Sequence, residues 1–333
     1  MDRMQFVQGV TRTRVFETRL LTKPLIDRMI DADDIDEVIK ILAETEYSKS
    51  LSGVDNPKDY EKILSNELNR VYKVMGEVSV EPIVIDLLAL KYEYHNLKVL
   101  IKEQEFNKDL SNLYISIATT EPEKLKLAYK DGDFSDIDEE FKRAIEATIM
   151  NLHENHDPQQ IDITMDRYYF EHLYQMAKDT EIDLFIEYVR DMIDFINIKS
   201  SIRMKRQEKD IRFVEDVILE NGNIDKDDIL SSYGDSVDNM IQTFKNSKIS
   251  SALIKGLNSY RETNRLSEFE KSMDDYLIEL IKDSKYVTFG PEPLFAYVLA
   301  KEAEIKNLRI IMVSKINNLS PDVIRGRVSD LYV

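Results

Sequence analysis

The sequence contains no cysteine and few of the residues that interrupt helices. With no cysteine among 333 residues, disulfides, thiolate catalysis and cysteine-ligated zinc are excluded. Only nine glycines and eight prolines are present. An all-β protein needs many more such residues in its turns, so their scarcity favours long helices. We therefore expect a mainly α-helical chain, long enough for two or three domains.

Long hydrophobic runs are also missing. The longest, "PIVIDLLAL" and "RIIMV", are far too short to cross a bilayer. The N-terminal "MDRMQFVQGVTRTR" has no apolar core between its charges, which argues against a secretory signal. We expect a cytosolic protein, which can still dock onto a membrane complex.

Positive charge is in deficit. The chain has 45 Lys and Arg against 63 Asp and Glu, giving a net charge of −18. Such a surface repels phosphate backbones and anionic lipid head groups. We expect no nucleic-acid partner and no direct lipid anchor.

The motifs of common active sites are absent as well. There is no Gly-x-x-x-x-Gly-Lys and no Gly-x-Gly-x-x-Gly, the two usual phosphate cradles. His153 and His156 could share a helix face, but a metal site needs more ligands, and we interpret them as exposed residues at a helix end. The acidic segments 131–142 and 221–230 lack the glycine and glutamate positions of a calcium loop, and we interpret both as solvated turns. We predict no catalytic, cofactor or metal site, and thus a protein that is not an enzyme.

Helical patterns account for much of what is present. Apolar residues gather on one side of predicted helices over 35–44 and 182–198. Gly290, Pro291 and Pro293 open a helix that continues without a break through residue 309. Ser320 is placed to cap another helix, with Pro321 at its first position.

One short motif occurs three times, about 100 residues apart, a spacing much longer than that of a typical solenoid repeat. Each copy has an acidic residue, an asparagine three positions later, then Leu or Ile, then Lys or Arg. The acid, asparagine and cation are Glu93, Asn96 and Lys98; Asp194, Asn197 and Lys199; and Glu304, Asn307 and Arg309. On a helix the acid and the asparagine share one face. An apolar face follows in each copy, although Ser201 makes it partly polar in the second.

The spacing of the motif predicts three related helical domains, at 1–107, 108–209 and 210–333. We interpret the motif mainly as a duplicated packing helix, since apolar helical stripes are usually core. The three cations are interpreted first as partners of nearby carboxylates, with contact to another protein as the alternative.

Residues 293–328, "PLFAYVLAKEAEIKNLRIIMVSKINNLSPDVIRGRV", resemble the closing signature of the C-subunit family of V-type and A-type rotary ATPases, whose counterpart in eukaryotic vacuolar enzymes is the d subunit. Residues 11–48 are similar to the opening helices of that family. The chain length, the triplication and the lack of Trp and Cys also fit, so the resemblance extends over the whole chain.

The resemblance implies a non-catalytic rotor component. Its fold would be a funnel of three similar helical domains around a pseudo-threefold axis. It would join the central shaft, made of the D and F subunits, to the membrane ring of proteolipid subunits, on the cytoplasmic side, and it would transmit torque for ion transport. It would need no cofactor and would be a monomer when isolated.

Two other interpretations remain open on the sequence. A generic helical adapter or scaffold predicts short repeats, whereas these repeats are the size of a domain. A helical-bundle enzyme would need the metal or phosphate motifs that the sequence lacks.

Overall fold

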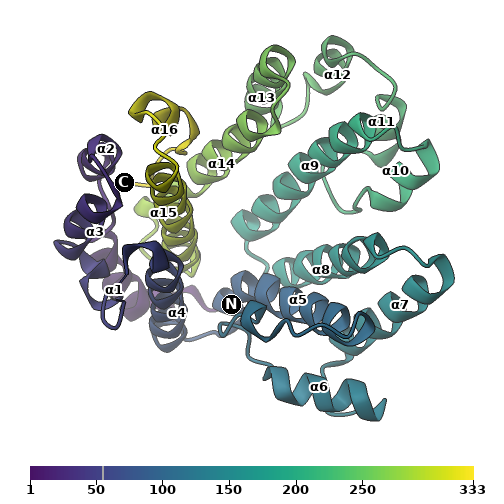
Figure 1. Cartoon of the computed structure of the whole chain (residues 1–333), viewed down its shortest axis with the longest axis horizontal. Coiled ribbons are helices and arrows are strands. Elements are labelled where there is room, and N and C mark those ends of the chain that lie inside the picture. The colour runs from purple at the N-terminus through teal and green to yellow at the C-terminus, as the bar shows by residue number, and fades with distance from the viewer. Residues whose placement is uncertain (55) are drawn as a thin grey trace. The chain divides into compact units, whose positions relative to one another are not determined.

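A computed structural model describes residues 1–54 and 56–333 of the chain. Every regular element in these ranges is a helix, as the sequence predicted (Figure 1). No helix in the same ranges is long and apolar enough to cross a membrane.

The chain forms two compact units. The first unit combines Met1–Ile85 with Ser236–Val333, so it is built from both ends of the sequence. Its 3-10 helices are η1 (Arg3–Phe6), η2 (Glu46–Lys49), η3 (Pro57–Asp59) and η5 (Asp283–Tyr286). Its α-helices are α1 (Val7–Glu17), α2 (Lys23–Asp31), α3 (Ile35–Ala43), α4 (Tyr60–Val78), α12 (Val237–Phe244), α13 (Ser250–Thr263), α14 (Leu266–Lys282), α15 (Glu292–Ile316) and α16 (Pro321–Arg327).

The second unit is the continuous segment Asp86–Asp235. It contains most of α5 (Ile83–Glu105), then η4 (Ser111–Leu113), α6 (Pro122–Asp131), α7 (Glu139–Asn155), α8 (Gln159–Thr180), α9 (Asp183–Arg206), α10 (Ile211–Val217) and α11 (Lys226–Ser231). The first two motif copies lie in this unit, on α5 and α9, and the third lies on α15 of the first unit. The division into three domains at 1–107, 108–209 and 210–333 stays a prediction.

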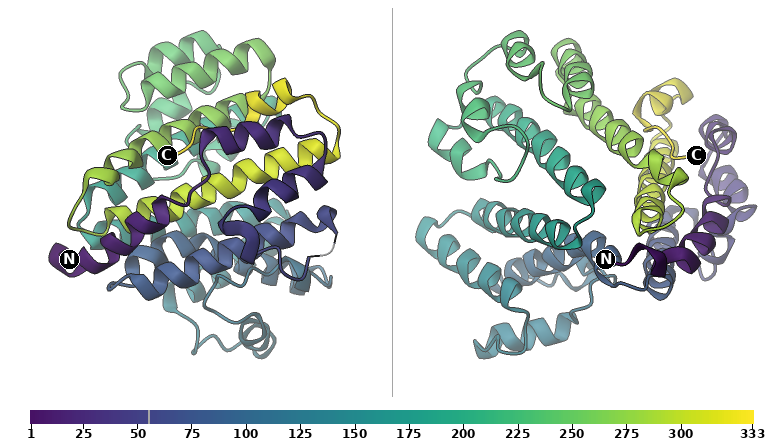
Figure 2. Two further views of the ribbon diagram at one scale, coloured as in Figure 1. Left: turned by 90° about the vertical axis from the view of Figure 1, so that its left-hand side faces the viewer. Right: turned by 180° about the vertical axis from the view of Figure 1, so that it is seen from behind.

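Helix α15 is the centre of the first unit. Its N-terminal residues, 292–301, are all buried, and α1, α3, α4, α14 and α16 pack around the helix (Figure 2). A helix that is apolar on every side must be covered on every side, which explains this position. The C-terminal half of α15 joins α2, α3 and α4 in one apolar core that includes Met29, Val38, Leu64 and Leu308.

The predicted helix starts are confirmed, with one difference in detail. Gly290 adopts φ +131°, and α15 begins two residues later and runs through the third motif. Helix α16 begins at Pro321 with Ser320 at the N-cap position. However, the Ser320 side chain accepts no backbone hydrogen bond, so the cap comes from its backbone conformation alone.

Candidate functional site

The three motif asparagines make the same contact. In each copy the side-chain amide donates to the carbonyl and accepts from the N–H of one residue in the segment that follows the helix. The pairs are Asn96 with Ile115 (3.0 and 2.9 Å), Asn197 with Leu219 (2.9 and 2.8 Å), and Asn307 with Ser329 (3.0 and 2.9 Å). Each of these three partner residues lies outside the helices, so its backbone N–H and carbonyl have no helical hydrogen bond. The asparagine side chain pairs with both groups. We call these contacts the three asparagine clamps.

The acid of each motif also binds backbone N–H groups. Glu93 accepts from the N–H of Thr119 and, at 2.8 Å, from its hydroxyl. Asp194 accepts from the N–H groups of Asn223 and Ile224 at 2.9 and 3.0 Å. In the first two copies, therefore, one helix face holds the following segment at two points.

The acid of the third copy binds a different part of the chain. Glu304 accepts from the N–H of Leu21 at 2.5 Å, and 283 residues separate the two. In this copy the N-terminal region provides the backbone donor that a downstream segment provides in the other two copies. This bond ties the opening helices to α15.

The apolar face of each motif is core, as predicted. Leu97, Leu100 and Ile101 are buried on α5, and the equivalent residues of α15 are fully buried. On α9 the polar Ser201 is buried between Ile198 and Ile202.

The motif cations lie in less buried places. Lys98 bonds the carboxylate of Asp166. Arg309 makes a bidentate pair with Glu61, at 2.8 and 3.1 Å, in which both side chains are exposed. Lys199 is half-buried on α9. The geometry of Lys98 and Arg309 agrees with carboxylate pairing, and contact with another protein stays a prediction for all three cations.

A buried ion network lies beside the third motif, and sequence reasoning missed it. The Lys301 ammonium is fully buried, 2.7 Å from Glu304 and 3.2 Å from Glu67. Arg70 binds both oxygens of Glu67, at 2.8 and 2.7 Å. The Tyr47 hydroxyl donates to Glu304 at 2.8 Å, and the Tyr47 ring faces the Lys301 ammonium at 4.6 Å. These residues come from η2, α4 and α15, so the network connects the N-terminal helices to the central helix.

Glu67 and Lys301 of this network are charged at neutral pH. Burial alone would raise the pKa of Glu67, but the hydrogen bonds and charges of Arg70 and Lys301 lower it below its ordinary value. Burial opposes the charge of Lys301, yet Glu304 and Glu67 raise its pKa above the ordinary value. Burial and the neighbouring carboxylates raise the pKa of Tyr47 well above the usual range, so its hydroxyl stays a donor. A lone lysine after a long apolar run, in "PLFAYVLAK", was the signal in the sequence.

The second motif has a tight loop over its acid. A Cβ at residue 222 would overlap the Asp194 carboxylate, so a larger residue there would displace this buried acid. Asp194 is almost fully buried, and burial raises its pKa to about 6. The segment 221–230 is therefore not only the solvated turn that we expected, because Gly222, Asn223 and Ile224 pack on α9.

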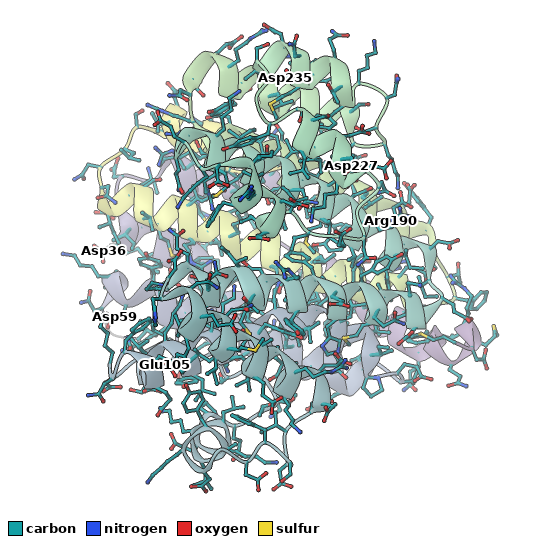
Figure 3. All side chains as sticks on the ribbon, turned by 90° about the vertical axis from the view of Figure 1, so that its right-hand side faces the viewer. Asp36, Asp59, Glu105, Arg190, Asp227 and Asp235 are labelled. Carbon is teal, nitrogen blue, oxygen red and sulfur yellow. The ribbon has the colours of Figure 1, made fainter. Side chains whose placement is uncertain are left out.

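Arg190 secures the same loop from α9, with its guanidinium 3.0 Å from the carbonyl of Gly222. The Asn223 side chain donates to Asp191 at 2.8 Å. Figure 3 labels Arg190 on α9 and Asp227 on the neighbouring α11. The "NGN" triplet was the only sequence signal for this loop.

The remaining polar features do not form a reaction centre. Within the described ranges, no group of three or more His, Asp or Glu side chains is arranged to hold a metal. His153 lies exposed near the end of α7 and bonds Glu105 at 2.9 Å, while His156 ends that helix with φ 53°.

A cavity of about 400 Å³ lies in the first unit between α2, α14, α16 and the final residues. Three of its lining cations already bind groups of the chain: Lys271 bonds the Val328 carbonyl, and Lys282 and Arg325 bond carboxylates. Most of the positive charge around this cavity is thus already neutralised.

Comparison with known proteins identifies the family of this chain. The family model described as "ATP synthase (C/AC39) subunit" matches residues 9–327. The chain belongs to this family. It is 29% identical over 321 residues to the C subunit of the V-type sodium ATPase of Enterococcus hirae, with 95% of each chain covered. It is 24% identical over 343 residues to the C subunit of the A-type ATP synthase of Methanocaldococcus jannaschii, with 96% of this chain and 85% of the other covered. As a member of the C/AC39 family, the chain is a non-catalytic subunit of a V-type or A-type ATPase.

Proposed function

We propose that the chain is a central-stalk component of its rotary ATPase, joining the central shaft to the membrane proteolipid ring and transmitting torque for ion transport. The observation that carries this proposal is the family match, which extends from residue 9 to residue 327 and therefore includes all three motif copies. The partners that we propose are the D and F subunits of the shaft and the proteolipid ring, on the cytoplasmic side of the membrane.

A coupling protein must transmit force without deforming, and the internal contacts support that role. Each asparagine clamp fixes a motif helix to a neighbouring segment through two hydrogen bonds. The Lys301 network crosses three elements and is fully buried at its ammonium, where ionic contacts are screened little by salt. None of these groups needs to move for a chemical step.

The repeated clamp also supports our proposal of three related domains, at 1–107, 108–209 and 210–333, arranged with pseudo-threefold symmetry. Because the same amide-to-backbone contact recurs three times, a common ancestral unit explains it more simply than three independent origins. We further propose shaft contact as a second role for Lys98, Lys199 and Arg309, beside their pairing with carboxylates.

The proposal is tested by reconstituting the contact with the shaft and the contact with the ring separately. The purified chain should be a monomer. It should bind the isolated shaft pair, bind the detergent-solubilised ring, and bring the two together in one complex on a sizing column. Mixing shaft and ring without the chain is the control and should give no complex. A chain that binds neither component, or a shaft and ring that associate equally well without it, contradicts the proposal.

A further inference from the structure

Helix α9 carries two buried polar atoms that have no hydrogen-bond partner among the described residues. They are Nε of Arg190, which is a donor, and Oδ2 of Asp194, which is an acceptor. Each atom therefore lacks the kind of partner that the other could provide. Residues four apart are neighbours on the surface of a helix, so the two side chains are within reach of each other. Buried polar groups are rarely left unpaired, so this pair needs an explanation.

Both side chains contact the same loop residue instead of each other. The Arg190 guanidinium donates to the carbonyl of Gly222 at 3.0 Å. The Asp194 carboxylate lies so close to Gly222 that a Cβ there would overlap it. We call residues 220–224 the α9 loop. The arginine and the acid are both engaged in holding this loop on the helix.

The α9 loop has few other attachments to α9. Oδ1 of Asp194 accepts from the N–H groups of Asn223 and Ile224 at 2.9 and 3.0 Å. The Asn223 side chain donates to Asp191 at 2.8 Å. The loop is thus held by two acids and one arginine, and its attachment depends on their charge.

The two ends of the α9 loop are fixed separately. On one side the Asn197 clamp holds Leu219 through two hydrogen bonds. On the other side α11 begins at Lys226. Asn221 turns the chain with φ 70°, in the left-handed region that asparagine tolerates. A movement confined to the loop therefore leaves the clamp and the neighbouring helices in place.

The closed loop opposes a charge on Asp194. This side chain is 1% exposed, and burial raises its pKa to about 6 although the hydrogen bonds from the loop act in the other direction. The charge of Asp191, which is fully buried, adds to the increase in pKa. An ionised Asp194 would keep one buried oxygen without a hydrogen bond, which is unfavourable.

The other charged groups around this part of α9 are exposed or already paired. Lys226 of α11 bonds Glu220 at 3.4 Å, and Arg167 of α8 donates to the carbonyl of Asp216 at 2.8 Å. The charged residues of α10 and the acids at the start of α11 are exposed: Arg212, Glu215, Asp216, Asp225, Asp227 and Asp228. Arg190, on the same helix, is the cation placed to neutralise the buried acid.

We propose that Arg190 and Asp194 form a pH-dependent switch that controls the α9 loop. While Asp194 is protonated, the loop is closed and Arg190 holds the Gly222 carbonyl. When Asp194 releases its proton to solvent, Arg190 turns to pair with it, the Gly222 carbonyl is freed, and the loop leaves α9. The ion pair gives both unpartnered atoms a partner. This switch does not depend on the function proposed above.

The direction of the pH response follows from the burial of Asp194. The closed loop binds the proton more tightly than the open loop, so opening is favoured as pH rises. With a pKa of about 6 in the closed state against an ordinary 3.8, the equilibrium constant for opening should increase about ten-fold between pH 5 and pH 7.

Two measurements on the purified full chain test the switch. Hydrogen exchange at the amides of Asn223 and Ile224, corrected for the intrinsic effect of pH, reports opening of the loop. The NMR signal of the Arg190 Nε–H reports the ion pair. We expect about ten-fold faster corrected exchange at pH 7 than at pH 5, and a shift of the Arg190 signal over the same range. Asp194→Asn should abolish both changes, whereas Asp216→Asn, an exposed acid of α10, should leave both unchanged.

Three results would overturn the proposal. The first is loop exchange that is constant between pH 5 and pH 7 after correction. The second is an equal increase in Asp194→Asn. The third is an Arg190 signal that stays constant while the loop opens, because Arg190 would then not be the partner of the acid. The first and third results are read on the wild-type chain, so they decide the matter even if Asp194→Asn does not fold.

Discussion

The side-chain amide of Asn307 pairs with both backbone groups of Ser329, at 3.0 and 2.9 Å, in a fully buried setting. Asn197 and Asn96 make the same contact on their own helices, with Leu219 and Ile115. The repeated motif is therefore explained by one structural role, in which a helix holds the chain that follows it.

Replacing each clamp asparagine by alanine should destabilise the protein. Each change leaves a backbone N–H and a carbonyl without a partner, and an unsatisfied buried group costs about 1–3 kcal/mol. Asn197→Ala and Asn307→Ala should cost more than Asn96→Ala, because the clamps of Asn197 and Asn307 are fully buried and that of Asn96 is only partly so. Denaturant unfolding measures the costs, and hydrogen exchange should accelerate at the amides of Leu219 and Ser329. The exposed Asn155→Ala is the control, and equal losses in all four variants would contradict the clamp.

Removing the buried cation should be more costly than removing an exposed one. Lys301→Met leaves Glu67 and Glu304 facing each other without the ammonium, and breaking a buried pair in this way costs about 3–5 kcal/mol. Adding Glu304→Gln to the variant should restore part of the loss by removing one uncompensated charge. Urea titration of the single and double variants tests this, and a loss within about 1 kcal/mol for Lys301→Met would show that the network contributes little.

Replacing Arg309 by Glu, which reverses the charge, should separate the two roles proposed for a motif cation, carboxylate pairing and shaft contact. Its pair with Glu61 is exposed, and such pairs contribute only about 0–1 kcal/mol. We expect a small drop in melting temperature and, if Arg309 also contacts the shaft, weaker shaft binding in the assay described above. A lower melting temperature with unchanged binding would assign Arg309 to structure alone.

Asp194 should make stability depend on pH. Burial raises its pKa from 3.8 to about 6, so the folded chain holds this proton more tightly than the unfolded chain. The stability that the protonated group contributes is present below about pH 4 and is lost as pH rises to about 6. At about 1.4 kcal/mol per pKa unit, the penalty above that range is roughly 3 kcal/mol.

Asp194→Asn removes this titration and keeps an oxygen for the N–H groups of Asn223 and Ile224. The unfolding free energy of the variant, relative to that of the wild type, should therefore increase between pH 4 and 7. Denaturant titrations of both proteins across this range measure it. A difference that is constant with pH would show that Asp194 titrates normally.

Local sequence signals predicted the helical class and the positions of individual helices. Gly290, Pro291 and Pro293 indicated the start of α15, and the spacing of the motif indicated three equivalent asparagines. Both signals are local, because turn chemistry and helical periodicity depend on residues close in sequence.

The tertiary partners could not be predicted in the same way. Glu304 binds the N–H of Leu21 across 283 residues, and Lys301 binds Glu67 from another helix. Nothing in the sequence around either residue identifies its partner, because such a contact exists only once the two ends of the chain fold into one unit. The loop at Gly222 was interpreted as a solvated turn for the same reason. It packs on Asp194, and this acid lies on α9, separated from the loop in the sequence by α10.

The most direct test of the adapter role compares two activities in one reconstituted ATPase with and without this protein. If the protein only joins shaft to ring, the soluble head without it should still hydrolyse ATP, while ATP-driven ion transport into proteoliposomes should be lost. Adding back the purified chain should restore transport. Normal ion transport without the protein, or a head that cannot hydrolyse ATP until the protein is added, would contradict the adapter role.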